Sequence, residues 1–364
     1  MAGVAERAAE RLAGVPSYRR GLPGPGPAAG KLSSNESPLG PSPAVRAAIT
    51  AAASSVNRYP EPESTAEILA ARAGVARSQI VLTNGSDELC YLVASLLLGR
   101  GRVAVVGDPC YQIDATATLL AGATVRRVPL DSGGHDLEAM AKASVGASVV
   151  WIPSPHNPTG VASDPDDLAR FMSAVPEDCL VVLDEAYRAF SDRDRRPDVT
   201  RLLGAHPNLL VQRTLSKDFA LAGLRVGYAL TSATLARSLE TARAPFSVNS
   251  IALSAVSAAL ASDSWRTMAI ARVCEERSRL EAALRRLHIE HYPSQANFVT
   301  ARVDLSLLAG RLGEAGLALR SGSDLGLPGW TRISIGWAPQ MAVLRSILFA
   351  SLDGASHPSD MMET

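Results

Sequence analysis

Five polar segments of the sequence each follow a short run of apolar, β-branched residues. Such runs are typical of buried strands, and ligands of open α/β sheets bind beyond the carboxyl ends of the strands. The side chains in these segments are therefore the first candidates for chemistry. The five segments are Asn84-Gly85-Ser86-Asp87-Glu88, Asp108-Pro109-Cys110-Tyr111, Ser154-Pro155-His156-Asn157-Pro158-Thr159-Gly160, Asp184-Glu185-Ala186-Tyr187 and Thr214-Leu215-Ser216-Lys217.

One group of these side chains is suited to an anion. Gly85-Ser86-Asp87 follows a strand-like run and opens a helix, so its backbone N–H groups and hydroxyl can hold a phosphate. Ser216 and Arg225 add a hydroxyl and a guanidinium for the same dianion. Tyr111 offers a flat face for an aromatic ring. Together they fit a phosphorylated aromatic aldehyde.

A carboxylate and an amine complete the requirements of such a compound. Asp184 ends the apolar run 180–183, where a buried carboxylate is costly unless it is paired. A protonated pyridine nitrogen is such a partner, and the cationic ring is an electron sink. Asn157 and Tyr187 can reach a phenolic oxygen on that ring. Lys217 follows another apolar run, where desolvation lowers the pKa of an amine and makes it a Schiff-base nucleophile.

Each piece also has an ordinary structural explanation. Asn-Gly-Ser and Asn-Pro-Thr-Gly are common turn sequences, an aspartate after a strand is usually a helix cap, and a single lysine is usually solvated. The functional interpretation is favoured by the joint order of the segments, each of which follows a strand-like run.

The pattern of the chain predicts the elements that position these residues. Helical stretches of ten or more residues separate most of the strand-like runs, which predicts an α/β fold with a mostly parallel, seven-stranded sheet between helices. The seven runs are 79–83, 102–107, 124–129, 148–152, 179–184, 209–213 and 225–230.

The pattern changes near residue 264. A long helix is expected at 264–287, followed by short strands near 297–302 and 331–336, which is typical of a smaller α+β domain. The predicted division is an N-terminal arm at 1–30, a large domain at 31–262, a small C-terminal domain at 263–353 and a tail at 354–364.

Composition restricts the function classes. The 36 basic and 36 acidic residues give a formal net charge of +0, which provides no overall field to attract nucleic acid or a membrane. The four cysteines are widely separated, so no metal site is predicted. The longest apolar run, near 89–98, is shorter than the ~20 residues of a spanning helix, and no signal segment is evident, so the cytoplasm is expected. A GxGxxG motif of nicotinamide dehydrogenases is absent.

The segment Ser216–Gly227, SKDFALAGLRVG, resembles the Schiff-base signature of one enzyme family. That family is the class I/II aminotransferases of the fold-type-I pyridoxal-phosphate group, and the closest branch is that of the histidinol-phosphate aminotransferases. Residues 33–41 and 57–60 resemble two further motifs of the branch, and the resemblance runs from about Leu32 to Gly336. It implies that pyridoxal 5'-phosphate is held by Lys217 and that amino groups pass to 2-oxoglutarate or another oxo acid.

The resemblance also implies roles outside the five segments. Tyr59 would cross a homodimer interface and touch the phosphate of the neighbouring cofactor. Arg332 matches the arginine that clamps the substrate α-carboxylate, for which a bidentate guanidinium is well suited. Arg320 matches a position that contacts the substrate phosphate, and Tyr18 matches a tyrosine near the substrate.

Three departures leave alternatives open. Cys110 stands where serine or threonine commonly precedes the stacking tyrosine, and His156 stands where asparagine is frequent; both are expected to line or border the pocket. Segment 244–250 looks more like the aromatic amino acid aminotransferases of the same branch, which favours an apolar substrate side chain. The alternatives are therefore an aromatic amino acid aminotransferase, or a lyase or decarboxylase on the same fold that shares Lys217 and Asp184.

Overall fold

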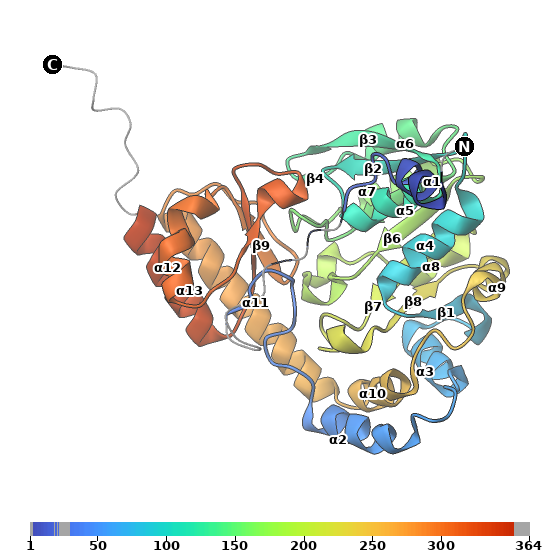
Figure 1. Ribbon diagram of the computed structural model, residues 1–364, viewed down its shortest axis with the longest axis horizontal. Coiled ribbons are helices and arrows are strands. Elements are labelled where there is room, and N and C mark those ends of the chain that lie inside the picture. The colour runs from blue at the N-terminus through green and yellow to red at the C-terminus, as the bar shows by residue number, and fades with distance from the viewer. Residues whose placement is uncertain (1–2, 18, 20, 22–29, 353–364) are drawn as a thin grey trace.

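The computed structural model describes residues 3–17, 19, 21 and 30–352 of the 364-residue chain. Two sheets are present, a large one and a small one, and they lie side by side in Figure 1. The predicted tail at 354–364 and most of the segment 22–30 lie outside the described residues.

The large sheet has eight strands in the order β1-β8-β7-β6-β5-β2-β3-β4. Neighbours from β7 to β3 are parallel, whereas β8 and β4 pair antiparallel with their neighbours. The predicted mostly parallel sheet is confirmed, with one more strand than the seven expected because β4 has only two residues and no alternation to reveal it. The strands are β1 (Ile80–Thr83), β2 (Val103–Asp108), β3 (Thr124–Asp131), β4 (Gly134–His135), β5 (Val149–Pro153), β6 (Leu180–Asp184), β7 (Leu209–Thr214) and β8 (Gly227–Leu230).

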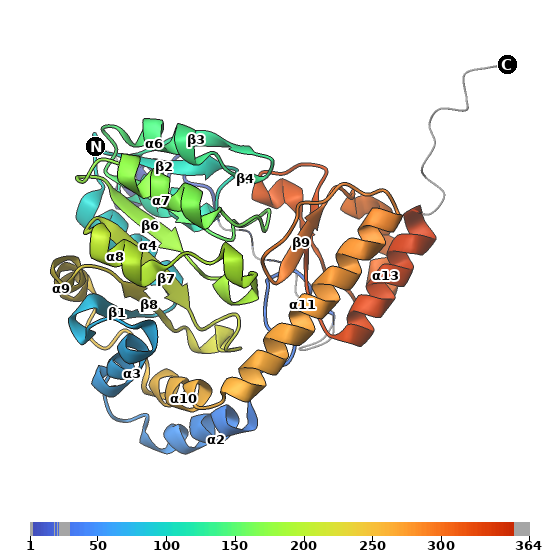
Figure 2. The same cartoon turned by 180° about the vertical axis from the view of Figure 1, so that it is seen from behind.

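Helices cover both faces of this sheet because successive strand residues point to opposite sides and both sides are apolar. Within β6, for example, Val181 packs into one hydrophobic cluster and Val182 into the other. Helices α4, α5 and α9 cover one face (Figure 1), and α2, α3, α6, α7, α8 and α10 the other (Figure 2). Their bounds are α2 (Pro43–Ala52), α3 (Glu63–Ala73), α4 (Ser86–Leu97), α5 (Gln112–Leu120), α6 (Leu137–Ser144), α7 (Pro165–Ala174), α8 (Val199–Ala205), α9 (Ala233–Ala242) and α10 (Ser250–Leu260).

The start of several helices follows from local sequence. Ser42 and Asp164 accept hydrogen bonds from backbone N–H groups of the first turns of α2 and α7, and a proline follows each of them. A short polar cap followed by proline is a strong start signal, since the cap satisfies a free N–H and proline needs none. The exposed helix α1 (Val4–Arg11) precedes the sheet.

The small sheet is antiparallel in the order β10-β11-β9 and packs on helices from the C-terminal part of the chain. Its strands are β9 (Phe298–Ala301), β10 (Arg320–Ser321) and β11 (Thr331–Ser334), and its helices are α11 (Asp263–Arg286), α12 (Ala309–Glu314) and α13 (Ala338–Leu352). Backbone hydrogen bonds from Leu32 to Ala318 and from Ser334 to Leu32 hold the segment after residue 30 against this sheet.

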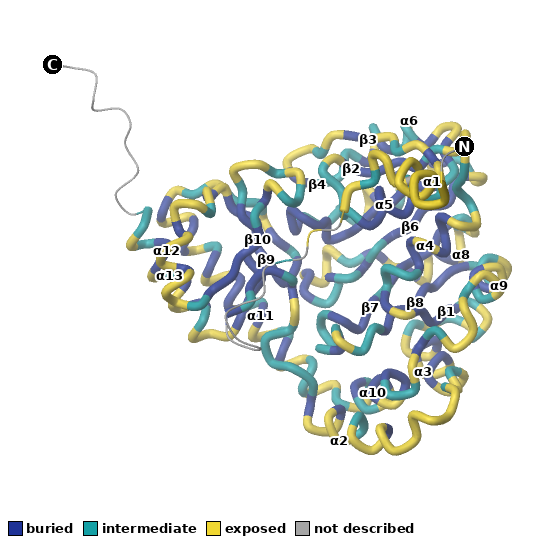
Figure 3. Tube along the Cα trace, viewed as in Figure 1, coloured by how far each residue is buried: buried dark blue, intermediate teal, exposed yellow. Residues whose placement is uncertain are grey.

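Helix α11 joins the two parts, as Figure 1 shows. Near its start, Arg266 forms an ion pair of 2.6 Å with Asp218 beside the large sheet. Further along, Leu280 and Leu284 are buried in the hydrophobic cluster that includes the small sheet. Figure 3 shows the buried strand β9 beside α11. The predicted long helix is confirmed, whereas the division into domains at residue 262 stays a prediction. Among the described residues, no helix is both long and apolar enough to cross a membrane.

Candidate active site

Two adjoining cavities, of about 260 and 760 Å³, lie at the carboxyl ends of the central strands. Both are lined by Tyr111, Asn157, Tyr187 and Lys217, which come from four of the five polar segments. Asp184, Ser216 and Arg225 line the larger cavity, and the small sheet contributes to the smaller one. The parallel order of β5, β6 and β7 brings these loops together at one edge, as the sequence pattern predicted.

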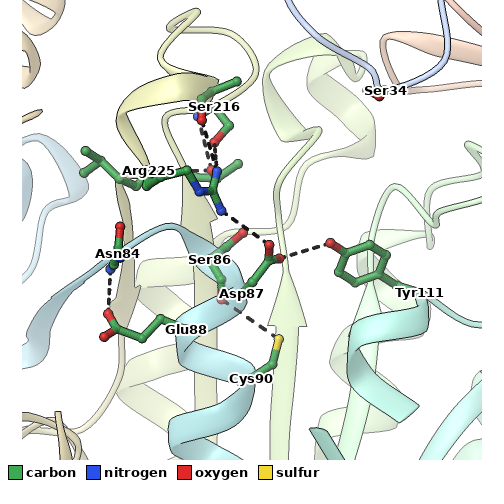
Figure 4. A network of polar contacts seen from close by, with 12 residues as sticks. Ser34, Asn84, Ser86, Asp87, Glu88, Cys90, Tyr111, Ser216 and Arg225 are labelled. Atoms are coloured by element: carbon green, nitrogen blue, oxygen red, sulfur yellow. Dashed lines mark hydrogen bonds and ion pairs between the residues drawn. The ribbon is translucent and has the colours of Figure 1, made fainter. Parts of the chain in front are cut away.

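The anion-binding candidates form one cluster around Arg225 (Figure 4). One guanidinium nitrogen lies 3.3 Å from an oxygen of Asp87 and another lies 3.5 Å from Oγ of Ser216. The hydroxyl of Tyr111 donates to the other oxygen of Asp87 at 3.0 Å. A Cβ on Gly85, whose φ is +77°, would clash with the guanidinium, so glycine is needed for Arg225 to reach the start of α4.

The carboxylate of Asp184 stands at the end of β6 and receives two N–H donors. Its Oδ1 accepts from the backbone of Ala186 at 2.8 Å, and its Oδ2 accepts from Nε2 of Gln212 at 3.1 Å. Burial raises the pKa of Asp184 to about 7, against the opposing effect of these hydrogen bonds. The site therefore lacks sufficient positive charge for this carboxylate and would favour a cationic partner.

The amine of Lys217 lies just after β7, at the junction of the cavities. Its Nζ is 3.3 Å from the backbone oxygen of Ser34 and 5.7 Å from the ring centroid of Tyr187. Tyr187 is buried, and its hydroxyl accepts a hydrogen bond of 3.0 Å from Nδ2 of Asn35. The lysine lines both cavities and shares the larger one with Asp184, so a ligand there can contact both side chains.

Two arginines reach the smaller cavity from neighbouring strands. Arg320 on β10 and Arg332 on β11 are directly opposite in the antiparallel register, so their side chains leave the same face of the small sheet. Arg332 donates to Oδ1 of Asn157 at 2.7 Å and to the oxygen of Ser33 at 2.9 Å. Arg320 is 4% exposed and donates to the backbone oxygen of Arg19. The pair forms a cationic wall suited to an anionic substrate group.

Not every residue singled out in the sequence reaches the cavities. Tyr59 is 77% exposed, stacks on Phe246 at 4.4 Å between ring centroids and does not line either cavity. Tyr18 lies outside the described residues. Cys110 lines the smaller cavity, whereas His156 is buried behind it and segment 244–250 is absent from both linings. Among the residues of this set that the structure describes, only Cys110 lines a cavity of this chain.

The structure adds residues that the sequence pattern missed. Ser33, Ser34 and Asn35 line the smaller cavity, although they belong to a segment that was noted only for its resemblance to a motif. Gln212 supports Asp184 from inside β7. A polar residue within the apolar run 209–213 is the one signal that could have identified it.

Two histidines, the buried His156 and the half-buried His135, support the loop that carries Asn157. His135 and His156 pack edge to face with 4.8 Å between ring centroids, and His156 is hydrogen bonded to Thr159 at 2.9 Å. Burial lowers the pKa of His135 to about 4 and that of His156 well below its usual value. Both rings are therefore neutral at pH 7.

Because the pKa values of these two histidines are lowered, we expect the protein to lose stability in acid. A pKa that is lower in the folded than in the unfolded protein stabilises the fold above the unfolded value of about 6.5, and this contribution is lost as the pH falls toward 4. We expect the stability of His135→Gln to depend less on pH between 6.5 and 4 than that of the wild type. The free energy of unfolding that the wild type loses over this range should exceed that of the variant by up to about 3 kcal/mol, as measured by thermal unfolding. The exposed His288→Asn is the control, and parallel pH profiles for His135→Gln and the wild type would contradict the expectation.

Comparison with known proteins agrees with this geometry. The sequence pattern of the family "Aminotransferase class I and II" matches residues 30–347. The chain is 41% identical over 316 residues to histidinol-phosphate aminotransferase 1 of Dechloromonas aromatica, covering 86% of this chain and 87% of that protein. It is 41% identical over 313 residues to histidinol-phosphate aminotransferase 2 of Pseudomonas aeruginosa, covering 84% of both chains.

The fold is also similar to solved structures. The crystal structure of histidinol-phosphate aminotransferase from Sinorhizobium meliloti, in complex with pyridoxal-5'-phosphate, has a TM-score of 0.83 and 26% identity, covering 98% of this chain and 96% of that chain. The family pattern spans most of the chain, and the two relatives of 41% identity cover 86% and 84% of it. The chain therefore belongs to the class I and II aminotransferases.

Proposed function

We propose that this protein is a pyridoxal-phosphate aminotransferase of histidinol-phosphate type, which passes the amino group of its donor to 2-oxoglutarate or another oxo acid. The relatives of 36–41% identity that carry this name support the donor class. The single observation that carries the proposal is the common lining of the cavities, where Lys217 lies between Asp184 with Arg225 on one side and the arginine pair 320 and 332 on the other.

The residues present fit the cofactor. A protonated ring nitrogen would provide the cation that the half-buried carboxylate of Asp184 lacks. The start of α4, with Ser216 and Arg225, provides N–H groups, a hydroxyl and a guanidinium for the phosphate. Tyr111 at the shared lining has the flat face that a ring can stack on.

The chain's own groups account for the remaining requirements of transamination. When bound, the cofactor supplies an aldehyde that captures the amino group and a cationic ring that withdraws electrons from it. Arg332, which donates to Asn157, would orient the α-carboxylate of the oxo acid or of an amino acid donor. The Nζ of Lys217, which lines both cavities, would take the proton from the carbon that bears the donor's amino group.

A homodimer is part of the proposal. The exposed stack of Tyr59 on Phe246 places two large aromatic rings at the surface, away from the cavities of its own chain. A second copy that received Tyr59 near its cofactor phosphate would bury these rings. The domain division at residue 262 and the cytoplasm remain predictions from the sequence.

Arg320 provides the sharpest test of the donor class. Since Arg320 would bind the donor phosphate, Arg320→Ala should lose a charge-assisted contact of about 2 to 3 kcal/mol, or roughly 30- to 150-fold in kcat/KM, with histidinol phosphate. The rate with phenylalanine should stay within about threefold. Arg311→Ala, at an exposed arginine on α12, is the matched control. Half-reaction rates with both donors are the measurement.

Other outcomes have defined meanings. An equal loss of kcat/KM with both donors would show that Arg320 does not bind the donor phosphate. Half-reactions with phenylalanine, tyrosine and tryptophan faster than with histidinol phosphate would favour the aromatic aminotransferase. A lyase or decarboxylase would not leave the amino form of the cofactor after one turnover with the donor, and the absorption spectrum separates that alternative.

A further inference from the structure

A second carboxyl group, that of Asp114, is buried and is connected to Asp184 through two other side chains. Asp114 is in the first turn of α5 and is 3% exposed. It does not line either cavity, and neither the five polar segments nor the family motifs include it. A buried carboxyl group is costly unless it is hydrogen bonded or neutral, so its surroundings show which of these applies.

Three contacts connect Asp114 to Asp184 across four elements. Oδ1 of Asp114 lies 3.7 Å from Sγ of Cys90 on α4. The same sulfur lies 3.6 Å from Oε1 of Gln212 on β7, and Nε2 of Gln212 donates to Oδ2 of Asp184 on β6 at 3.1 Å. Cys90 and Gln212 are at most 1% exposed, so the connection is shielded from solvent.

The positions of the hydrogens follow from the donors available. Gln212 presents its amide nitrogen to Asp184 and its oxygen to Cys90, so the thiol is the donor that the structure offers to that oxygen. A thiol has one hydrogen, and burial raises the pKa of Cys90 and keeps that hydrogen in place. If Cys90 donates to Gln212, its contact with Asp114 needs a hydrogen from the carboxyl group. The longer contact of 3.9 Å from Cys90 to the oxygen of Ser86 does not change this requirement.

The charges around Asp114 agree with a neutral carboxyl group. The titratable groups that face it are Cys90 and Asp87 on α4, Cys110 just before α5, and Asp184 on β6, all of which are acids. Burial, followed by the charge of Asp184, raises the pKa of Asp114 well above its usual range, and the opposing effect of the Cys90 contact is smaller. No ion pair to Asp114 occurs in the part of the chain that the structure describes. Asp184, which has two N–H donors, is the better place for one negative charge.

We propose that Asp114 is a positioning residue that holds a proton at neutral pH and donates a hydrogen bond to Cys90. Every donor in the hydrogen-bonded chain Asp114–Cys90–Gln212–Asp184 then points toward the carboxylate of Asp184. Such an aligned chain polarises each of its hydrogen bonds in turn and favours the anion at its end. This inference rests on the proposed function. In the enzyme, Asp114 would keep Asp184 charged and oriented toward the ring nitrogen of the cofactor.

The protonation of Asp114 is tested in the protein without cofactor. Infrared difference spectra of wild type and Asp114→Asn at pH 7 should show a protonated carboxyl band that the variant lacks. The folded pKa lies above the unfolded value of about 3.9, so the proton stabilises the fold in acid and this contribution is lost as the pH rises. The melting temperature of Asp114→Asn relative to wild type should therefore increase as the pH rises from 4 to 8. The absence of the band, with parallel stability profiles, would overturn the proposal.

The positioning role is tested with matched pairs. Asp114→Asn and Cys90→Ser keep a donor at each position, whereas Asp114→Leu and Cys90→Ala remove it. We expect Asp114→Leu and Cys90→Ala to weaken binding of pyridoxal phosphate roughly tenfold, equivalent to about one unit in the pKa of Asp184. Their partners should stay within about threefold of wild type. If Asp114→Leu does not fold, the Cys90 pair decides alone, and equal affinities within that pair would contradict the role.

These experiments separate the two proposals. A protein that shows the protonated Asp114 band but never binds pyridoxal phosphate would refute the proposed function and, with it, the positioning role. A protein that binds the cofactor and transfers amino groups while Asp114 is ionised would retain the proposed function and refute this inference.

Discussion

Lys217→Ala is expected to reduce kcat by roughly 10,000-fold or more and to abolish the visible absorption of a covalently bound cofactor. The Nζ of Lys217 is placed both to bond the cofactor and to move the substrate proton, so one substitution removes two functions. Steady-state kinetics and an absorption spectrum of the purified variant with added pyridoxal phosphate are the measurements.

The other lysines provide controls, because the chain has only three. Lys142 forms an exposed ion pair with Glu138 on α6, and Lys142→Ala should retain full activity. Lys31 lines the larger cavity and pairs with Glu36 at 2.9 Å, so it is the one plausible competitor for the cofactor. Turnover and a bound chromophore in Lys217→Ala would transfer the role to Lys31 and refute the account of the site.

Asp184→Asn is expected to affect the loaded and the empty protein in opposite directions. In the loaded enzyme, removal of a buried ion pair with the ring nitrogen should reduce kcat roughly 100- to 1,000-fold, which corresponds to about 3 to 4 kcal/mol. In the empty protein, burial raises the pKa of Asp184 to about 7, so ionisation of this group opposes folding.

The sign of the pH effect follows from linkage. A carboxyl group with a folded pKa above its unfolded value stabilises the fold below about pH 4, and this contribution is lost as the pH rises to about 7. At pH 8, Asp184→Asn without cofactor should therefore unfold at a higher temperature than the wild type without cofactor. Its free energy of unfolding should be higher by up to about 4 kcal/mol, with a smaller difference near pH 4. The exposed Asp178→Asn is the control. A variant that is destabilised at pH 8 and still active would contradict both expectations.

The large sheet was predictable because its strands are long enough to show apolar runs. The seven runs correspond to β1, β2, β3, β5, β6, β7 and β8, and the polar segments that follow five of them, β1, β2, β5, β6 and β7, contribute to the two cavities at one edge. Strand β10 has two residues and no periodicity, so its pairing with β11 was not evident. The position of Arg320 opposite Arg332 was therefore not predicted, and only the expected role of Arg320 followed from family resemblance.

The remaining parts of the site depend on contacts between distant segments. Asn35 reaches Ser334 on β11, 299 residues away, through a hydrogen bond of 2.8 Å from its backbone N–H. No local pattern predicts such a contact, because it depends on how two separately formed elements pack. The connection from Asp114 to Asp184 is of the same kind, since it passes through side chains of four elements.

The most direct test is to reduce the cofactor-loaded protein with borohydride and to map the modified peptide by mass spectrometry. Borohydride converts a C=N bond between a lysine and the cofactor into a stable amine, and the chain has three lysines to choose from. We expect the added mass on the peptide that contains Lys217 and on no other. Modification of Lys31 or Lys142 instead, or no modification after incubation with pyridoxal phosphate, would contradict it.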